Sequence, residues 1–328
     1  MDSFLESRGI ELNRELTRDE KRKVSSLVAS QIVGTFASIK ADYIDMFSAL
    51  YATKMYFVDF PRNVSQVNYS YSDRALYISN KININKPNES LIFECLHALQ
   101  DDSFGRIGLC HIRSGKGLIL NEAVNQYIVN RVIGNKINYI DKLDIRINTH
   151  SKNHYPLETS LIEEIVTLID DEDDLLDGAL AANGTFENSL KSNFGSEAFK
   201  NIRDNLDKLF ILRHSINKYN KTDVINEIKE LYYSTQKTIY ENYYNFVNLY
   251  DLEDAKAKLN ELNILFENTE SMNEFTVYYN ERAKAVLEEE SKRTALIVVD
   301  KKIFSTLFTK LKELTSLLKG SYNENSDK

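Results

Sequence analysis

Three residues in the first half of the chain have types and a spacing that could do chemistry: Glu94, His97 and Glu122. Glu94 and His97 are three positions apart in an apolar segment typical of a helix, so their side chains share one helix face. Glu122 lies near the start of the next helical segment. Carboxylates and imidazoles can transfer protons or hold metal ions. A Glu-x-x-His pair also occurs by chance, and the alternative is a polar pair that forms a hydrogen bond between partly buried helices.

The segments around these residues predict a strand, a hairpin and two helices in that order along the chain. Aromatic and β-branched residues at 55–60 predict a strand, and the alternation at 68–79, around Ser72 and Asp73, predicts a hairpin. Apolar periodicity then predicts a helix over 90–100, a loop over 101–117 and a second helix over 118–134, which Gly134 closes.

This order resembles the zincin metallopeptidases, specifically the gluzincin group, over residues 55–165. In that family one helix carries His-Glu-x-x-His, and the next helix supplies a glutamate ligand, often within an Asn-Glu pair. The resemblance implies that Glu94 is the general base and that His97 and Glu122 are zinc ligands, with Asn121 before Glu122. It also implies a small mixed sheet that packs on the helices carrying the site.

The sequence departs from the family pattern at the first histidine, where it has Phe93. Phenylalanine cannot bind a metal, and one histidine with one carboxylate is a poor zinc site. The leading hypothesis is therefore a metallopeptidase-like protein with a degenerate site, inactive or weakly active, which binds a peptide or protein in the former cleft. In that case Phe93 fills the space of the metal, no cofactor is bound, and His97 pairs directly with Glu122.

Two alternatives stay open. The first is an active metal-dependent hydrolase with a substitute ligand, for which His111 is the first choice and which requires a ligand distance of about 2.1 Å to the metal. The other candidates for that ligand are Cys110, Asp101, His150 and His154. The second alternative is a helical interaction module without site chemistry, in which the tyrosine-rich segment 232–250 offers an exposed aromatic patch. That segment is otherwise interpreted as a packing seam between helices.

Three further motifs receive structural interpretations. The acidic run 170–174 lacks the spacing and the central glycine of a calcium loop, so a solvated helix end or loop is expected. The segment 114–117 lacks the full phosphate-loop pattern and is expected to form a turn. Cys95 is on a helix face turned away from His97 and is expected to be a core thiol.

The whole chain has 328 residues, a formal net charge of −8 and a sequence pI near 5.4. The acidic balance gives no support to nucleic-acid binding, and no apolar run approaches the roughly 20 residues that span a bilayer. The N-terminus lacks signal-peptide features, and two cysteines are too few for a disulfide scaffold, so a cytoplasmic protein is expected.

The predicted fold is α+β with an all-helical C-terminal half. N-terminal helices are expected over 24–39, after the Thr17 and Glu20 capping box, and over 43–52. Another helix is expected over 157–169, followed by helices only from residue 196, among them 255–266, 275–290 and 303–318. The predicted organisation is N-terminal helices over 1–54, a zincin-like core over 55–170, a helical part over 171–320 and a disordered tail over 321–328.

Overall fold

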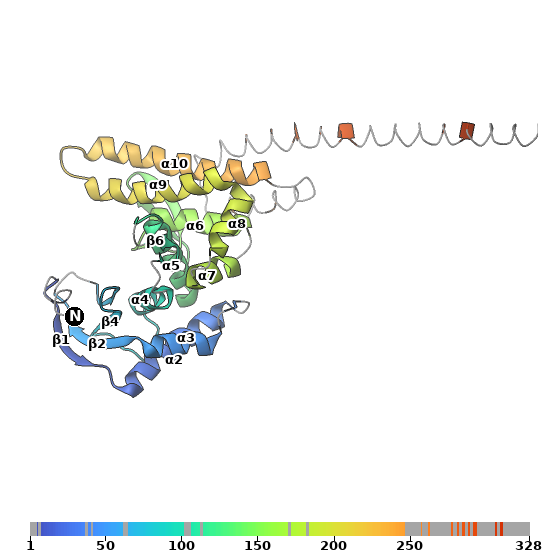
Figure 1. The fold of residues 1–328 in the computed structure, drawn as a ribbon. Coiled ribbons are helices and arrows are strands. Elements are labelled where there is room, and N and C mark those ends of the chain that lie inside the picture. Colours follow the sequence, from blue (N-terminus) through green and yellow to red (C-terminus); the bar gives the residue numbers. More distant parts are fainter. Residues whose placement is uncertain are drawn as a thin grey trace, which may run out of the picture.

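The N-terminal part of the molecule is built on a small mixed sheet (Figure 1). The computed structural model describes residues 8–246, apart from 37–38, 41, 62–64, 102–105, 112–113, 170–171 and 182–183, together with Leu5 and isolated positions between 257 and 310. The sheet has the order β1-β2-β4-β3, in which β2 and β4 are parallel and the other pairs are antiparallel. Its strands are β1 (Glu11–Glu15), β2 (Lys54–Asp59), β3 (Val67–Ser70) and β4 (Ala75–Ser79).

Two helices link β1 to β2. Helix α2 (Arg18–Thr35) begins at the predicted capping box, in which Thr17 and Glu20 exchange hydrogen bonds between side chain and backbone. Helix α3 (Tyr43–Ala52) follows, and Asp42 caps it by accepting the Asp45 amide.

The helices that carry the predicted site lie at the centre of the molecule (Figure 1). Helix α4 (Glu89–Gln100) is capped by Asn88 and packs against β3 and β4. A short hairpin, β5 (Arg106–Ile107) and β6 (Cys110–His111), leads to α5 (Leu118–Ile133). Helix α5 packs beside α4 and ends at Gly134, which adopts a left-handed conformation with φ 73°.

The remainder of the described chain is mainly helical. The hairpin of β7 (Asn138–Lys142) and β8 (Ile145–Thr149) precedes five helices. These are α6 (Pro156–Ile169), α7 (Glu172–Ala181), α8 (Thr185–Phe194), α9 (Ser196–Ser215) and α10 (Lys221–Phe246). The long helices α9 and α10 run side by side over α6 (Figure 1).

Helix α6 is buried on nearly all sides and carries three buried glutamates. Glu158 lies 3.2 Å from the Arg213 guanidinium of α9. Glu164 accepts a hydrogen bond of 2.6 Å from Gln236 of α10. Arg213 offsets part of the cost of burying Glu158, although neither carboxylate oxygen of Glu158 has a hydrogen bond to a described residue and burial raises its pKa. The two contacts connect α9 and α10 to α6.

The predicted α+β class with a helical C-terminal half is confirmed for the described residues. One hydrophobic cluster extends from Leu16 through α4, α5 and α6 to Tyr243 of α10. Among the described residues, no helix is both long and apolar enough to cross a membrane. The helices expected over 255–266, 275–290 and 303–318, and the tail over 321–328, lie outside the described residues except for isolated positions.

Several elements differ from the sequence prediction. Strand β1 was not predicted because all of its residues are exposed at the sheet edge, which leaves no apolar alternation. The β7–β8 hairpin was not predicted because its turn residues, Leu143 and Asp144, have positive φ of 56° and 59° without the usual Asn-Gly signal. The short β5–β6 hairpin lies in the segment expected to be a loop, and α8 was not predicted. The acidic segment after residue 171 is the start of α7, in keeping with the expected helix end.

Candidate functional site

A cavity of about 560 Å³ lies beside β3, over the first turns of α4 and α5. Its walls come from the turn after β3, from both helices and from the segment before α6. The lining includes Tyr71, Glu94, His97, Glu122 and Tyr155. All three residues singled out in the sequence therefore line one cavity. Its volume is within the range of about 300–1,000 Å³ usual for ligand sites.

His97 and Glu122 converge across α4 and α5. Nε2 of His97 lies 3.4 Å from Oε1 of Glu122, and the two side chains are 6% and 13% exposed. Burial alone would lower the pKa of His97, but the charge and hydrogen bonding of Glu122 outweigh it and raise the pKa above the usual value. The two helices thus bring together the imidazole and the carboxylate that the sequence separates by a loop.

Glu94 lies in the same cavity but does not join this pair by a hydrogen bond. Its Oε2 accepts the backbone N–H of Tyr69, at the edge of β3, at 2.8 Å. Burial raises the pKa of Glu94 to about 7, although His97 and the Tyr69 amide lower it. Glu94 can therefore exchange a proton near neutral pH.

The other ring nitrogen of His97 faces two groups. The hydroxyl of Tyr71 lies 2.7 Å from Nδ1, and the side-chain nitrogen of Asn125 lies 3.4 Å from it. Burial, and then the charges of Glu122 and Glu94, raise the pKa of Tyr71, so its phenol stays protonated. Tyr71 is thus able to donate to the imidazole.

A chain of buried amides fixes the direction of these hydrogen bonds. The backbone N–H of Leu109 donates to Oδ1 of Asn121 at 3.0 Å, which fixes the oxygen end of the Asn121 amide. The side-chain nitrogen of Asn121 therefore points the other way and donates to Oε1 of Gln100 at 3.1 Å. The nitrogen of Gln100 then donates to Oδ1 of Asn125 at 2.7 Å. The nitrogen of Asn125 donates back to Oε1 of Gln100 at 3.0 Å, and its second N–H is available to His97, 3.4 Å away. Because a backbone amide can only donate, the chain cannot be reversed.

This polarity bears on the tautomer of neutral His97. Nδ1 lies 3.4 Å from the donating nitrogen of Asn125, which favours an accepting Nδ1 and a proton on Nε2, toward Glu122. A histidine that binds zinc through Nε2 carries its proton on Nδ1 and needs an acceptor there. The Asn125 nitrogen is not such an acceptor, and the Tyr71 hydroxyl, 2.7 Å from Nδ1, is the group beside it that can accept.

Phe93 lies one helical turn before His97, at the position of the missing histidine. Its ring meets the imidazole edge to face, with centroids 5.1 Å apart. Tyr71 meets the imidazole from another direction, also edge to face, at 5.7 Å. Aromatic rings thus surround His97 where a metal site would place a second ligand.

The proposed substitute ligands differ in their surroundings. His111 is exposed, with Nε2 3.1 Å from Arg106. Asp101 accepts the Tyr69 hydroxyl at 2.8 Å. Cys110 is buried, and burial together with the charges of Asp207 and Glu122 raises the pKa of its thiol to about 11. Within the part of the chain that the structure describes, no group of three or more His, Cys, Asp or Glu side chains is placed to hold a metal ion.

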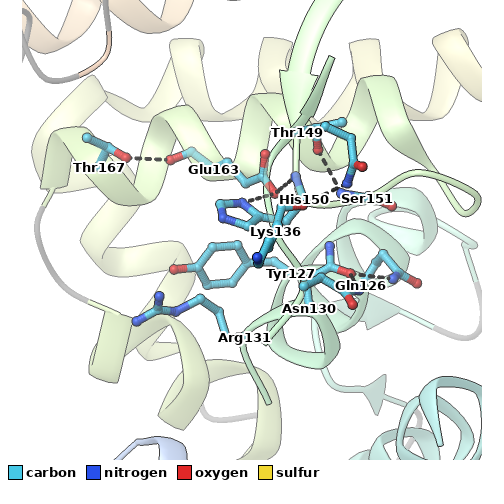
Figure 2. Close-up of polar contacts among 12 residues, drawn as sticks. Gln126, Tyr127, Asn130, Arg131, Lys136, Thr149, His150, Ser151, Glu163 and Thr167 are labelled. Atoms are coloured by element: carbon cyan, nitrogen blue, oxygen red, sulfur yellow. Dashed lines mark hydrogen bonds and ion pairs between the residues drawn. The ribbon is translucent and has the colours of Figure 1, made fainter. Parts of the chain in front are cut away.

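The two later histidines differ in position. His150 does not line the cavity: its backbone N–H and its Nδ1 lie 3.0 and 3.1 Å from Oε1 of Glu163 (Figure 2). His154 does line the cavity, but its side chain is exposed.

Two site residues were missed in the sequence. Tyr71 could have been found, because the alternation Tyr69-x-Tyr71 places both rings on one side of the hairpin. Tyr155 could not, because it depends on an unusual backbone: its φ is +47° directly before Pro156. Burial, followed by the charge of Glu122 and hydrogen bonding to it, raises the pKa of Tyr155.

The other sequence interpretations concern packing. Cys95 is fully buried, as expected for a core thiol. Tyr232, Tyr240 and Tyr243 are also buried, which confirms a packing seam for them and removes the motive for an exposed aromatic patch there. Tyr250 lies outside the described residues, as does the side chain of Tyr244.

Comparison of the chain with protein-family models, with curated proteins and with solved structures finds no match.

Proposed function

We propose that this chain is a metallopeptidase-like protein with a degenerate site, which binds a segment of a peptide or protein in the cavity beside β3. The observation that carries the proposal is the direct approach of His97 and Glu122, 3.4 Å apart, within a cavity of about 560 Å³. Each of the two groups that would hold a metal already has a partner, while the cavity beside them keeps room for a ligand.

The lining of the cavity supports a peptide as the ligand. Aromatic rings offer apolar contact area, and carboxylates and hydroxyls offer hydrogen-bond partners. The cavity also borders β3, the last strand of its sheet, so an extended chain can lie alongside this edge.

The proposal can be tested with a pool of short random peptides and the full-length protein. Peptides retained after gel filtration are identified by mass spectrometry, with and without a chelator. We expect retention that the chelator does not change, and retained peptides of unchanged mass. Cleavage that stops on chelation would instead favour the metal-dependent hydrolase.

Two tryptophan substitutions supply the control. Ser90 lines the cavity in the first turn of α4, so Ser90→Trp fills it. Ser30 is exposed on α2, so Ser30→Trp adds the same ring at the surface. Retention must fall in S90W and persist in S30W, with circular dichroism showing that both variants fold. Equal retention by all three proteins would refute binding in this cavity.

A further inference from the structure

We infer that the cavity selects an ammonium group, carried on the bound peptide as a lysine side chain or as a free amino terminus. This inference rests on the proposed function, because it names the chemical class that the same cavity takes. It is drawn from three features of the lining: the charges, the state of the carboxylate oxygens and the aromatic rings.

The charges of the lining are predominantly negative. Glu89, Glu94 and Glu122 line the cavity, together with Arg8, whose charge lowers the pKa of Glu94, and His97, whose own pKa is raised. Glu89 accepts a hydrogen bond of 2.9 Å from the neutral amide of Gln126. Among the described residues, no lysine or arginine forms a salt bridge with any of these three glutamates. A concave site with carboxylates of this kind attracts cations.

Glu94 is the carboxylate best placed to meet a ligand. Its Oε2 is held by the Tyr69 N–H at 2.8 Å, while its Oε1 has no hydrogen bond to any described residue. Glu122, in contrast, is engaged by His97 at 3.4 Å. An ammonium group has three donors and no acceptor, so it can bond to Oε1 of Glu94 without displacing the Tyr69 amide.

The aromatic lining favours a cation further. Tyr69, Tyr71, Phe93 and Tyr155 all line the cavity, and the Tyr69 and Tyr71 rings meet edge to face with centroids 5.1 Å apart. Ammonium groups bind to the electron-rich faces of aromatic rings, in addition to bonding to a carboxylate. A carboxylate-bearing ligand, by comparison, would face the like charges of Glu89 and Glu122, and that of Glu94 above its pKa of about 7.

Three peptides that differ only at one residue and at the amino terminus test the inference. The first is N-acetylated and contains one lysine, the second has a free amino terminus and norleucine instead of lysine, and the third is acetylated and contains norleucine. Isothermal titration calorimetry compares their affinities. We expect the first or the second peptide to bind at least about tenfold more tightly than the third, and the tighter of the two identifies the source of the ammonium group.

Glu94→Gln should remove this preference, because the amide keeps the shape and the acceptor for Tyr69 but not the charge. Glu230→Gln, at an exposed position of α10, is the matched control and should keep it. Equal binding of all three peptides would overturn the ammonium inference and leave peptide binding intact.

A small molecule tests ammonium binding without a peptide, and so separates the ammonium inference from the peptide proposal. In NMR titrations of the full chain, n-butylamine should shift the signals of cavity residues, and n-butanol should not. If butylamine binds there but no peptide does, the ammonium inference stands and the peptide proposal fails. If neither butylamine nor any peptide binds, both fail.

Discussion

The side-chain nitrogen of Asn125 lies 3.4 Å from Nδ1 of His97, so a hydrogen-bond donor faces the imidazole opposite the nitrogen that meets Glu122. The identity of that donor is set from outside the cavity, by the Leu109 amide and the side chains of Asn121 and Gln100. A backbone N–H in a hairpin thus sets the direction of the amide that faces a buried histidine.

The first prediction concerns this tautomer. At a pH above the pKa of His97, ¹⁵N NMR of the imidazole should show the proton on Nε2. His154, which is exposed, provides an internal reference that should show a mixture of tautomers. A proton found on Nδ1 of neutral His97 would contradict the polarity assigned to the amide chain.

The second prediction concerns the missing ligand. Phe93→His completes the His-Glu-x-x-His pattern, but Asn125 still presents a donor to Nδ1 of His97. We expect F93H to bind zinc weakly, and the double variant F93H/N125D to bind it about 10–100-fold more tightly, because an aspartate accepts the Nδ1 proton. Zinc affinity is measured by competition with a chromogenic chelator.

A triple variant checks that the gained zinc is at the intended place. F93H/N125D/H97A should lose the affinity of the double variant. If F93H alone binds zinc as tightly as F93H/N125D, the amide chain does not control the site.

The third prediction concerns stability and pH. Burial raises the pKa of Glu94 to about 7 in the folded protein, from an ordinary value near 4.5. The folded state therefore binds more protons than the unfolded state between these values, so this group lowers the free energy of unfolding as the pH rises from about 4.5 to 7. His97, whose pKa is raised, acts in the same direction, since its stabilising protonated form is lost above its folded-state pKa.

Glu94→Gln removes the titration and should flatten this pH dependence. Urea unfolding at pH 5 and pH 8 should show a loss of about 1–3 kcal/mol for the natural chain, and a smaller loss for E94Q. Glu230→Gln, which changes the same charge at an exposed position, should leave the natural profile unchanged.

The fourth prediction concerns Gly108, in the turn between β5 and β6. It has φ +52°, and an added Cβ would lie 2.3 Å from Oδ1 of Asn121, the first side chain of the amide chain. Gly115 also has a positive φ, +64°, but an added Cβ there meets no atom within 4 Å. We expect Gly115→Ala to cost about 1 kcal/mol of unfolding free energy, and Gly108→Ala to cost clearly more.

The two alanine variants separate strain from displacement of the amide chain. The excess cost of G108A should be accompanied by a changed His97 signal in NMR, whereas G115A should leave that signal in place. Equal costs for the two variants would show that the turn can shift without moving Asn121.

The approach of His97 to Glu122 was expected from the resemblance to the zincin metallopeptidases, in which consecutive helices carry these two positions. Helix periodicity alone placed Glu94 and His97 on one helix face. The same periodicity gave Cys95 its place in the core. In both cases the helix period sets the direction of the side chain, and the packing of consecutive helices against each other determines what that side chain contacts.

The donors around Nδ1 could not be predicted. The direction of the Asn125 side-chain amide depends on the backbone N–H of Leu109. The sequence around Asn125 does not indicate where the Leu109 N–H lies. Likewise, Tyr155 reaches the cavity through a left-handed backbone that the sequence before Pro156 disfavours. The edge strand β1 was not predicted for a different reason: all of its residues are exposed, so it has no buried apolar face.

The buried glutamates of α6 also bear on how this protein can be handled in the laboratory. Cutting the chain after α6 would remove Arg213 and Gln236. Glu158 and Glu164 would then lose these partners and lie on an otherwise apolar surface. A fragment containing only the sheet and the cavity would thus be prone to precipitate. Work on the cavity calls for protein that retains α9 and α10.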